Sequence, residues 1–411
     1  MDVGNTAFIL ISAAMVFFMT PGLAFFYGGL GRRKNVISTM MMSVTPIAIA
    51  IIMWVVIGYS LSFSGQGKFF GNLNHLFLNG VSETTSHLGN KISDMTFSSF
   101  QMMFSIITLA IIIGAVVGRI RFTPLLIFMP LWLLLVYYPL AHMVWGGGLL
   151  AKLGALDFAG GDVVHISSGV TGLILAVVVG KRKDYGRIDY RPHNVPFVLL
   201  GTAILAFGWL GFNAGSALSA DSSATHAFMT TMLSAASGML SWILIEKKLH
   251  AKPSLVGSST GLVAGLVAIT PGAGYVSIAS SLLIGFLVSP VCYFAISVLK
   301  QKLDYDDALD AFGCHGVGGI FGGLATSVFT TPGLTSESGN FGLLYGSTHL
   351  LTAILIGILL TIIWTGVSSF IIIKAISYFM PLRVSQKEEA LGLDDSEHKE
   401  TAYPTFMGMD S

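Results

Sequence analysis

Charged residues are scarce in this sequence. Only 10% of its 411 residues are Asp, Glu, Lys or Arg, while 53% are apolar. Soluble domains usually have about 25% charged residues. Together with a mean hydropathy of +0.76, this composition excludes a soluble enzyme and indicates a chain that lies mostly in lipid.

Cysteine is also rare, and the net charge is close to zero. The two cysteines, Cys292 and Cys314, lie within apolar stretches, where a buried small side chain is favoured over a disulfide or a metal site. The formal net charge is only +1. Because the Lys and Arg residues form short clusters between apolar runs, we expect no nucleic-acid partner.

Long apolar runs dominate the sequence. A helix needs about 17 to 25 apolar residues to cross roughly 30 Å of hydrocarbon. These runs are continuous, which favours helices over the short alternating strands of a membrane barrel. We predict an all-α integral membrane protein with eleven transmembrane helices, at 6–29, 36–63, 97–118, 123–143, 163–180, 196–217, 225–246, 255–271, 275–299, 311–329 and 346–379.

The basic residues predict the orientation of the chain. Positively charged loops stay on the cytoplasmic side. If the N-terminus is outside and the C-terminus inside, only three of the 22 Lys and Arg residues remain outside, Lys68, Lys91 and Lys152. Ten of the 43 charges fall in 381–411, so we predict a transmembrane domain over 1–380 and a cytoplasmic tail over 381–411. The first run lacks a basic leader, and we expect no signal peptide.

The fifth and tenth predicted spans differ from the others. Both are short and rich in Gly and Ser, and each has a histidine near its start, His165 and His315, 150 residues apart. Five spans in each half is an odd number, so a duplicated half would be inverted in the bilayer. An ionisable residue within a membrane is more often functional than structural, although a carbonyl can satisfy a core histidine. The spacing alone does not establish that the two histidines touch.

Seven segments in order along the chain form a recognisable set. They are FYGGLGRRKNV (26–36), FQMMF (100–104), AHMVWGGG (141–148), GALDFAGGDVVHI (154–166), GWLGFNAGS (208–216), TPGAGYV (270–276) and DAFGCHGVGG (310–319). Together they resemble the Amt branch of the Amt/Mep/Rh superfamily of ammonium transporters, and the resemblance covers nearly the whole chain. It implies eleven transmembrane helices with an inverted five-plus-five repeat, assembled as a homotrimer with one pore per subunit.

The resemblance assigns aromatic residues to the outer part of the pore. It implies that Trp145, Phe104 and Ser216 recruit ammonium, with Phe100 beside them, and that Phe104 and Phe212 form a stacked gate. Aromatic faces attract a cation and a hydroxyl accepts one of its hydrogen bonds. Without the resemblance, Trp145 is equally well an interfacial residue and Phe104 a core residue.

By the same resemblance, His165 and His315 are twin histidines that line the pore below the gate. Two adjacent imidazoles repel each other when both are protonated, so the pair is expected to share one proton. Ammonium can lose a proton and cross as neutral ammonia, which potassium and sodium cannot do.

Acidic residues precede both unusual spans. Asp157 is predicted mainly to cap a helix by accepting backbone hydrogen bonds, although its charge can also favour cations in the vestibule. Asp310 similarly precedes its span by one residue. Asp304, Asp306 and Asp307 are expected to lie in a solvated cytoplasmic loop.

The tail resembles the regulatory segment of the same family. Its residues Gly392, Leu393, Asp394, His398, Ala402 and Tyr403 match that pattern, but Lys399 replaces an expected glycine. The resemblance implies packing against the cytoplasmic face and a PII-type nitrogen-signalling protein as a possible partner. A disordered acidic tail is the alternative.

We therefore predict an ammonium transporter in a plasma membrane, of the bacterial or archaeal inner-membrane kind, with the lipid bilayer as its surroundings. An ammonium sensor on the same scaffold is the alternative, although no output domain follows the tail. An enzyme is disfavoured, because two histidines without a third ligand make a poor zinc site and no activated nucleophile is evident. We expect no cofactor, metal or catalytic residue.

Overall fold

The computed structural model describes residues 2–188, 190–335 and 340–403. Within these ranges the chain is helical, and its only strand-like pairings are two isolated bridges, Ile120 with Arg383 and Val276 with Thr330. Eleven helical segments of the described residues are long and apolar enough to cross a membrane. The predicted all-α architecture with eleven spans is confirmed.

Most spans consist of one helix, and some contain a π-helical turn. The helices are α1 (Val3–Leu30), α2 (Val36–Met53), α3 (Tyr59–Phe63), α4 (Asp94–Ile113), α5 (Phe122–Trp132), α6 (Tyr138–Val144), α7 (Leu149–Lys152), α8 (Ser167–Val179), α9 (Val195–Gly215), α10 (Ser222–His250), α11 (Leu255–Ile269), α12 (Ile278–Phe294), α13 (Lys300–Lys302), α14 (Val317–Phe329), α15 (His349–Phe379) and α16 (Gln386–Leu391). The fifth span starts with the π-helical turn η5 (Gly161–Ile166), and the tenth with η8 (Phe312–Gly316).

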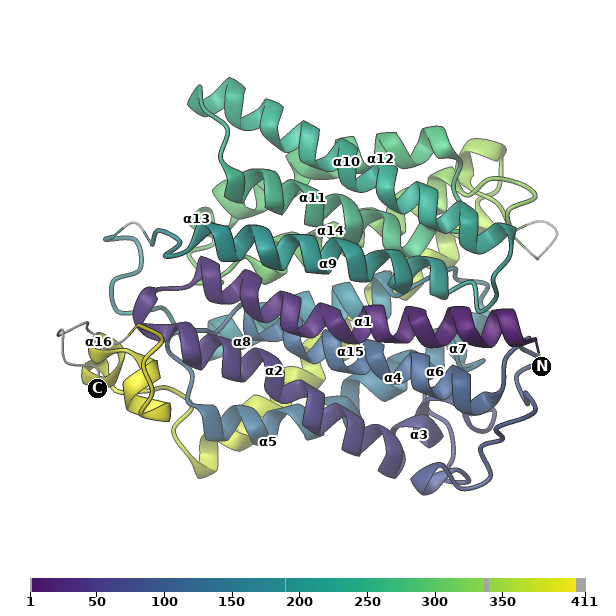
Figure 1. The fold of residues 1–411 in the computed structure, drawn as a ribbon, viewed down its shortest axis with the longest axis horizontal. Helices are drawn as coiled ribbons and strands as arrows, with labels where there is room; N and C mark the ends of the chain where they lie inside the picture. Colours follow the sequence, from purple (N-terminus) through teal and green to yellow (C-terminus); the bar gives the residue numbers. More distant parts are fainter. Residues whose placement is uncertain (1, 189, 336–339, 404–411) are drawn as a thin grey trace, which may run out of the picture.

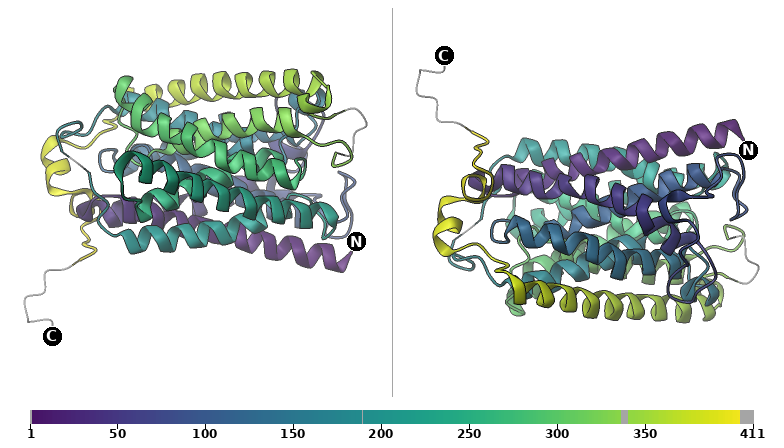
Figure 2. Two further views of the ribbon diagram at one scale, coloured as in Figure 1. Left: turned by 90° about the horizontal axis from the view of Figure 1, so that it is seen from above. Right: turned by 90° about the horizontal axis from the view of Figure 1, so that it is seen from below.

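The spans run side by side along the long axis of the molecule (Figure 1). Figure 2 shows the start of α1 at one end of this bundle and the yellow segment around α16 at the other. We call these ends the amino face and the tail face. Because the chain crosses the bundle at each span, η5 begins near the amino face and η8 near the tail face.

Glycine allows close helix contact in the first half of the bundle. A Cβ atom on Gly201 of α9 would lie 2.3 Å from the backbone nitrogen of Phe26 in α1. Backbone atoms cannot give way as a flexible side chain can, so a larger residue would separate the two helices. Without a strong hydrophobic drive between helices in lipid, such close van der Waals packing holds them together.

The same aspartate cap occurs at the start of both unusual spans. Asp157 accepts hydrogen bonds from the backbone nitrogens of Gly160 and Gly161, at 2.8 and 2.6 Å. Asp307 accepts from the backbone nitrogens of Ala311 and Phe312, at 3.1 and 2.7 Å. Each aspartate precedes the histidine of its span by eight residues. Two matching helix starts at opposite faces fit an inverted repeat.

The prediction that the three aspartates before the tenth span lie in a solvated loop is wrong for two of them. Asp306 and Asp307 are each 1% exposed, and only Asp304 reaches solvent. Arg182 donates two hydrogen bonds to the Asp306 carboxylate, at 2.8 and 2.6 Å, and the fully buried Arg119 donates to its backbone oxygen. Burial raises the pKa of Asp306, but the hydrogen bonds and charge of Arg182, together with Arg119, leave that pKa below its ordinary value. The loop therefore packs inward because its charges are paired.

Asp307 generates a pH-dependent prediction. Burial, with the charge of Asp310, raises the pKa of Asp307 to about 6 from 3.8. Below the unfolded-state pKa such a carboxyl group is protonated in both states and does not destabilise the fold. As pH rises from the unfolded-state pKa to the higher folded-state pKa, the free energy of unfolding falls. The wild-type protein should thus lose on the order of 2 to 3 kcal/mol through this group between pH 4 and pH 6. Asp307→Asn removes the titration. Thermal unfolding of both proteins should show the variant improving relative to the wild type as pH rises, whereas a constant difference would contradict the prediction.

Candidate functional site

A vestibule opens on the amino face. It is a cavity of about 440 Å³, and the described residues that line it include no Asp or Glu. Its lining comprises Leu88, Asn90, Phe97, Gln101, Val144, Trp145, Gly146, Gly147, Phe158, Ser216 and Leu218. The cavity therefore presents aromatic faces and neutral polar groups to a solute.

Two of the predicted recruitment residues line this vestibule directly. Trp145, which is half-buried, donates its indole N–H to the backbone oxygen of Asp157 at 2.9 Å. The Ser216 hydroxyl donates to the backbone oxygen of Phe212 at 2.9 Å, so its own oxygen remains able to accept a hydrogen bond. The ring of Phe104 lies 5.9 Å from Trp145 and nearly perpendicular to it, at 78°.

Phe100 and Phe104 lie behind the vestibule and are fully buried. Their rings are 4.9 Å apart. The side chain of Phe104 also packs on Phe212, with ring centroids 4.3 Å apart and planes tilted by 39°. Phe212 is fully buried too, so the structure brings the two predicted gate residues together across the path from the vestibule.

Sequence reasoning missed Gln101 and Asp162. The Gln101 side chain is 7% exposed, and its amide oxygen has no hydrogen-bond partner among the described residues. Gln101 also lines the vestibule, with this oxygen buried behind its surface. Asp162 is 8% exposed, and one of its carboxyl oxygens likewise has no partner in the described part of the chain. Their positions were the available signal in the sequence: Gln101 lies one turn before Phe104, and Asp162 lies one turn before His165.

His165 and His315 meet beyond the two phenylalanines. Their Nδ1 atoms are 3.2 Å apart, and both residues are buried, with exposed fractions of 1% for His165 and 5% for His315. One nitrogen must donate and the other accept, so a single hydrogen lies between the rings. The His165 ring also stacks on Trp209 at 5.3 Å. Sequence spacing could not establish this contact, because it depends on how deeply η5 and η8 enter the bundle.

Glycine permits this approach of the two pore helices. A Cβ atom on Gly169 of α8 would lie 2.2 Å from the backbone nitrogen of Gly316 in η8. The helices therefore touch backbone to backbone, one turn after His165 and directly after His315. Larger residues at this crossing would increase the distance between His165 and His315.

Narrow cavities lie on both sides of the His315 ring. One has a volume of only about 10 Å³, which is room for about one water molecule. Apart from His165, His315 and Trp209, its lining is apolar: Met19, Leu23, Phe26, Ile107, Ile111, Val164, Leu205, Phe212 and Val263. A second cavity of about 70 Å³ continues toward the tail face, past Asp310 and Cys314. Ring contacts therefore link the vestibule through Phe104 and Phe212 to His165, His315 and this second cavity.

Asp157 is not among the residues that line the vestibule. In addition to Gly160 and Gly161, the backbone nitrogen of Asp162 donates to its carboxylate, at 2.8 Å. Burial raises the pKa of Asp157, while these backbone hydrogen bonds act in the opposite direction. The structure gives Asp157 the geometry of the predicted helix cap. The two cysteines are buried and free, as predicted.

The tail packs against the bundle as far as residue 403, which argues against a disordered tail there. The backbone nitrogen of Ser38, at the start of α2, donates to Asp394 at 2.8 Å, and that of Lys183 donates to Glu389 at 2.8 Å. Lys399 adopts a left-handed conformation, φ 54°, which a glycine would adopt more easily. The tail residues 404–411 lie outside the described residues.

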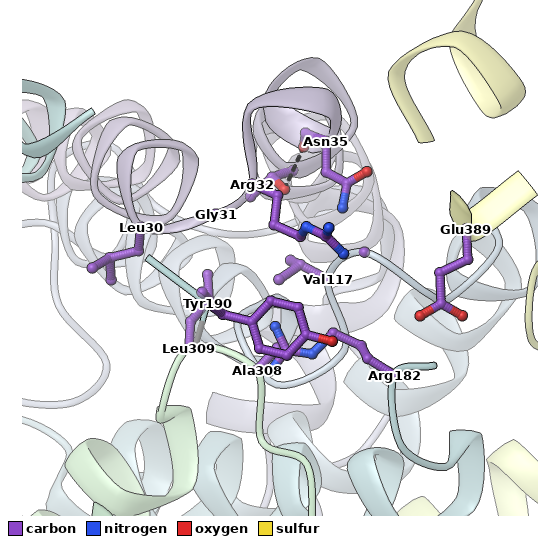
Figure 3. Close-up of a pocket in the computed structure, with 12 residues that line it drawn as sticks. Leu30, Gly31, Arg32, Asn35, Val117, Arg182, Tyr190, Ala308, Leu309 and Glu389 are labelled. Atoms are coloured by element: carbon purple, nitrogen blue, oxygen red, sulfur yellow. Dashed lines mark hydrogen bonds between the residues drawn. The ribbon is translucent and has the colours of Figure 1, made fainter. Parts of the chain in front are cut away.

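A small polar cavity separates the tail from the pore helices (Figure 3). It has a volume of about 30 Å³. Tyr190 lies between two guanidinium groups, with Arg182 at 4.1 Å and Arg32 at 5.2 Å from its ring centroid. Glu389 of α16 faces the same cavity. The tail therefore contacts the segments that follow α8 and precede α2.

Comparisons with known proteins agree on one family. A family model described as Ammonium Transporter Family matches residues 7–403. The chain is 48% identical to an ammonium transporter of Bacillus subtilis (strain 168) over 407 residues, 99% of this chain and 100% of that protein. It is 42% identical to ammonium transporter Amt1 of Archaeoglobus fulgidus over 405 residues, 98% of this chain and 100% of that protein.

Solved structures agree with the sequence comparisons. The crystal structure of Candida albicans Mep2 superposes with a TM-score of 0.89 at 34% identity, covering 94% of this chain and 88% of that one. A structure described as a sensor Amt protein superposes with a TM-score of 0.88 at 27% identity, covering 96% and 98%.

The glycine contact generates a prediction. Gly169→Ala should force the two pore helices apart and destabilise the protein by about 1 to 3 kcal/mol, because the new methyl group would meet backbone atoms. Gly366→Ala in α15 is the control, since a Cβ atom there meets only a Val170 methyl group at 3.8 Å. Thermal unfolding in detergent should show a clear loss for Gly169→Ala and none for Gly366→Ala. Equal stabilities would mean that the crossing can relax.

Proposed function

The chain belongs to the ammonium transporter family, and from this we propose that ammonium is recruited in the vestibule, loses a proton near the phenylalanine pair and crosses as ammonia past the two histidines. It is a multi-pass plasma-membrane transporter, not an enzyme. The observation that carries the proposed mechanism is the contact of His165 with His315, 3.2 Å between Nδ1 atoms, in an otherwise apolar cavity.

Recruitment depends on groups that prefer a cation to neutral ammonia. A cation over an aromatic face gains about 0.5 to 2 kcal/mol, and Trp145 and Phe104 offer such faces. Ammonium has four N–H donors, for one of which Ser216 supplies an acceptor oxygen. The absence of a carboxylate from the described lining favours weak, reversible capture over tight binding.

Deprotonation then determines what crosses. Moving an unpaired cation into a narrow apolar cavity has a large desolvation cost. Ammonium avoids this cost by releasing a proton to the histidine pair, which can accept it at a ring nitrogen and relay it, whereas potassium and sodium have no proton to release. The histidine pair offers ammonia both a hydrogen-bond donor and an acceptor, so the neutral molecule is not isolated in the pore.

The membrane orientation and the partners belong to the same proposal. With the amino face outside, the predicted basic residues lie inside. The transmembrane domain is assigned to 1–380 and a regulatory cytoplasmic tail to 381–411, supported by the contacts of Asp394 and Glu389. A homotrimer and a PII-type partner are inferred from the family resemblance. A sensor is the second candidate, supported by the similarity to a sensor Amt protein, and measurable ammonium flux in reconstituted vesicles separates the two.

The histidine pair is tested by replacing both residues. His165→Ala with His315→Ala should abolish selective ammonium transport, because the pore loses the two imidazoles that hydrogen-bond to each other, while the protein should still insert and assemble. Uptake and potassium exclusion are measured in vesicles. A double variant with wild-type flux that still rejects potassium would refute the role of the pair. Single acidic replacements should be milder, since a carboxyl group can still relay a proton.

Recruitment is tested at Trp145. Trp145→Leu should raise the half-saturation concentration about twofold to thirtyfold, since the aromatic face contributes about 0.5 to 2 kcal/mol. Trp364→Leu is a matched control: Trp364 is also half-buried and donates to a backbone oxygen at 2.9 Å, but it lies outside the vestibule. Ser216→Ala should cause a smaller loss, about 0.5 to 1.5 kcal/mol. An unaltered half-saturation concentration in Trp145→Leu would assign the tryptophan to the membrane interface.

A further inference from the structure

Asp310 supplies the one carboxylate among the described residues that line the cavity of about 70 Å³ on the tail side of His315. A cavity of about 10 to 15 Å³ holds one water molecule, so this cavity can hold an ammonium ion, which is of similar size. The hydroxyls of Thr260 and Tyr27 also line it, and each donates to a backbone oxygen at 2.9 Å. Both hydroxyl oxygens can therefore still accept a hydrogen bond. A carboxylate and two hydroxyl oxygens are suitable ligands for a small cation.

A cation of the chain itself already binds this carboxylate. Lys300 donates from Nζ to Oδ1 of Asp310 at 2.6 Å, and its side chain is only 15% exposed. A lysine side chain ends in an ammonium group with three N–H donors, which is the chemistry of an ammonium ion on a tether. Lys300 thus supplies the cation that the carboxylate would otherwise take from solution.

The other aspartates of the same loop have different partners. Asp304 forms an ion pair with Lys181. Asp306 forms one with Arg182, and the cap aspartate of the span binds backbone nitrogens. None of these three carboxylates lines the cavity. The position beside the pore is therefore particular to Asp310.

Helix packing holds Lys300 next to the tenth span. The π-helical turn η7 (Ala295–Leu299) directly precedes Lys300. A Cβ atom on Gly313 of η8 would lie 2.6 Å from Cγ1 of Ile296 in η7, so the two turns pack closely together. The lysine is thus placed by a packed element, whereas the members of a typical surface ion pair are held only by each other.

The backbone fixes Asp310 in the same way. Its φ angle of 60° lies in the left-handed region, which is costly for residues other than glycine, although aspartate adopts it more readily than most. The backbone nitrogen of the preceding residue, Leu309, donates to the oxygen of Gly114 at 3.0 Å and anchors this turn to the end of α4. The carboxylate therefore has a defined place at the end of the cavity.

We propose that Asp310 is a cation-binding site at the tail end of the pore and that the ammonium group of Lys300 occupies it as a tethered competitor. A group on a short tether acts at an effective concentration in the millimolar range. Free ammonium or potassium on the tail side must therefore displace Lys300 before it binds in the cavity. The pore remains open to ammonia at this end, because the carboxylate beside it does not collect cations. The binding site is inferred from the structure, and its consequence for transport rests on the proposed function.

The binding test removes the tethered cation. Lys300→Met keeps most of the side chain without its charge, and Lys302→Met, at an exposed position of the same helix α13, is the matched control. Melting temperatures are measured in detergent while ammonium chloride replaces choline chloride at constant ionic strength, since choline is too large for this cavity. Ammonium should stabilise Lys300→Met at a roughly tenfold lower concentration than the wild type, because its carboxylate is free. Lys302→Met should respond as the wild type does.

A double variant assigns the effect to Asp310. Lys300→Met with Asp310→Asn lacks the carboxylate as well, so its response to ammonium should return to that of the wild type. The proposal is overturned if Lys300→Met responds to ammonium as the wild type does, or if the double variant keeps the stronger response. If Lys300→Met does not fold, Lys300→Gln, which is polar but uncharged, replaces it with the same expectations.

Transport supplies the second measurement. In vesicles with the tail face inside, initial ammonium uptake is measured against the potassium concentration of the lumen, with choline as the balancing cation. Lumenal potassium should slow uptake by Lys300→Met several-fold and leave uptake by the wild type, Lys302→Met and the double variant unchanged. Equal inhibition of the wild type and Lys300→Met, or inhibition of neither, would overturn the competitor role. A wild-type protein without ammonium uptake would instead count against the proposed function and leave the melting result standing.

Discussion

The backbone contact between Gly169 and Gly316 is the constraint on which the centre of the molecule depends. Two helices that start at opposite faces meet inside the bundle where His165 and His315 touch, and a Cβ atom on Gly169 would lie only 2.2 Å from the backbone nitrogen of Gly316. A buried imidazole without a hydrogen-bond partner would be costly in an apolar interior. Each histidine supplies the partner of the other, so the helix crossing and the chemistry of the pore are the same structural feature.

Backbone hydrogen bonds stabilise a buried aspartate at the start of each of the two crossing helices. Asp157 and Asp307 each accept hydrogen bonds from the first nitrogens of a π-helical turn, which holds that turn and its histidine at a fixed depth. A carboxylate at a helix start is also favoured by the positive end of the helix dipole. In both cases backbone hydrogen bonds hold a buried carboxyl group at the start of a helix.

The sequence was sufficient to predict the eleven spans, because their length and hydropathy are set by bilayer thickness, and it predicted the cap at Asp157 from its place before a helix. It did not predict the burial of Asp306, because the partner Arg182 is 124 residues away and pairing across such a distance leaves no local pattern. The sequence also did not predict the contact between His165 and His315, because how far each helix enters the bundle depends on packing. Gln101 was missed because a lone amide in an apolar run usually indicates nothing about ligand binding.

Capture and selection are separated along the proposed path. The vestibule, about 440 Å³ and lined by aromatic and amide groups, can distinguish cations only by their size and their hydrogen bonds. The cavity beside the histidines, about 10 Å³, is apolar apart from His165, His315 and Trp209, so we expect it to favour a small uncharged species. A change in the vestibule should therefore alter how much ammonium is captured without altering which species crosses. The tail contacts neither cavity directly: it binds the starts of α2 and α5 and the segment after α8, so we expect an effect of the tail on transport to be transmitted through these helix ends.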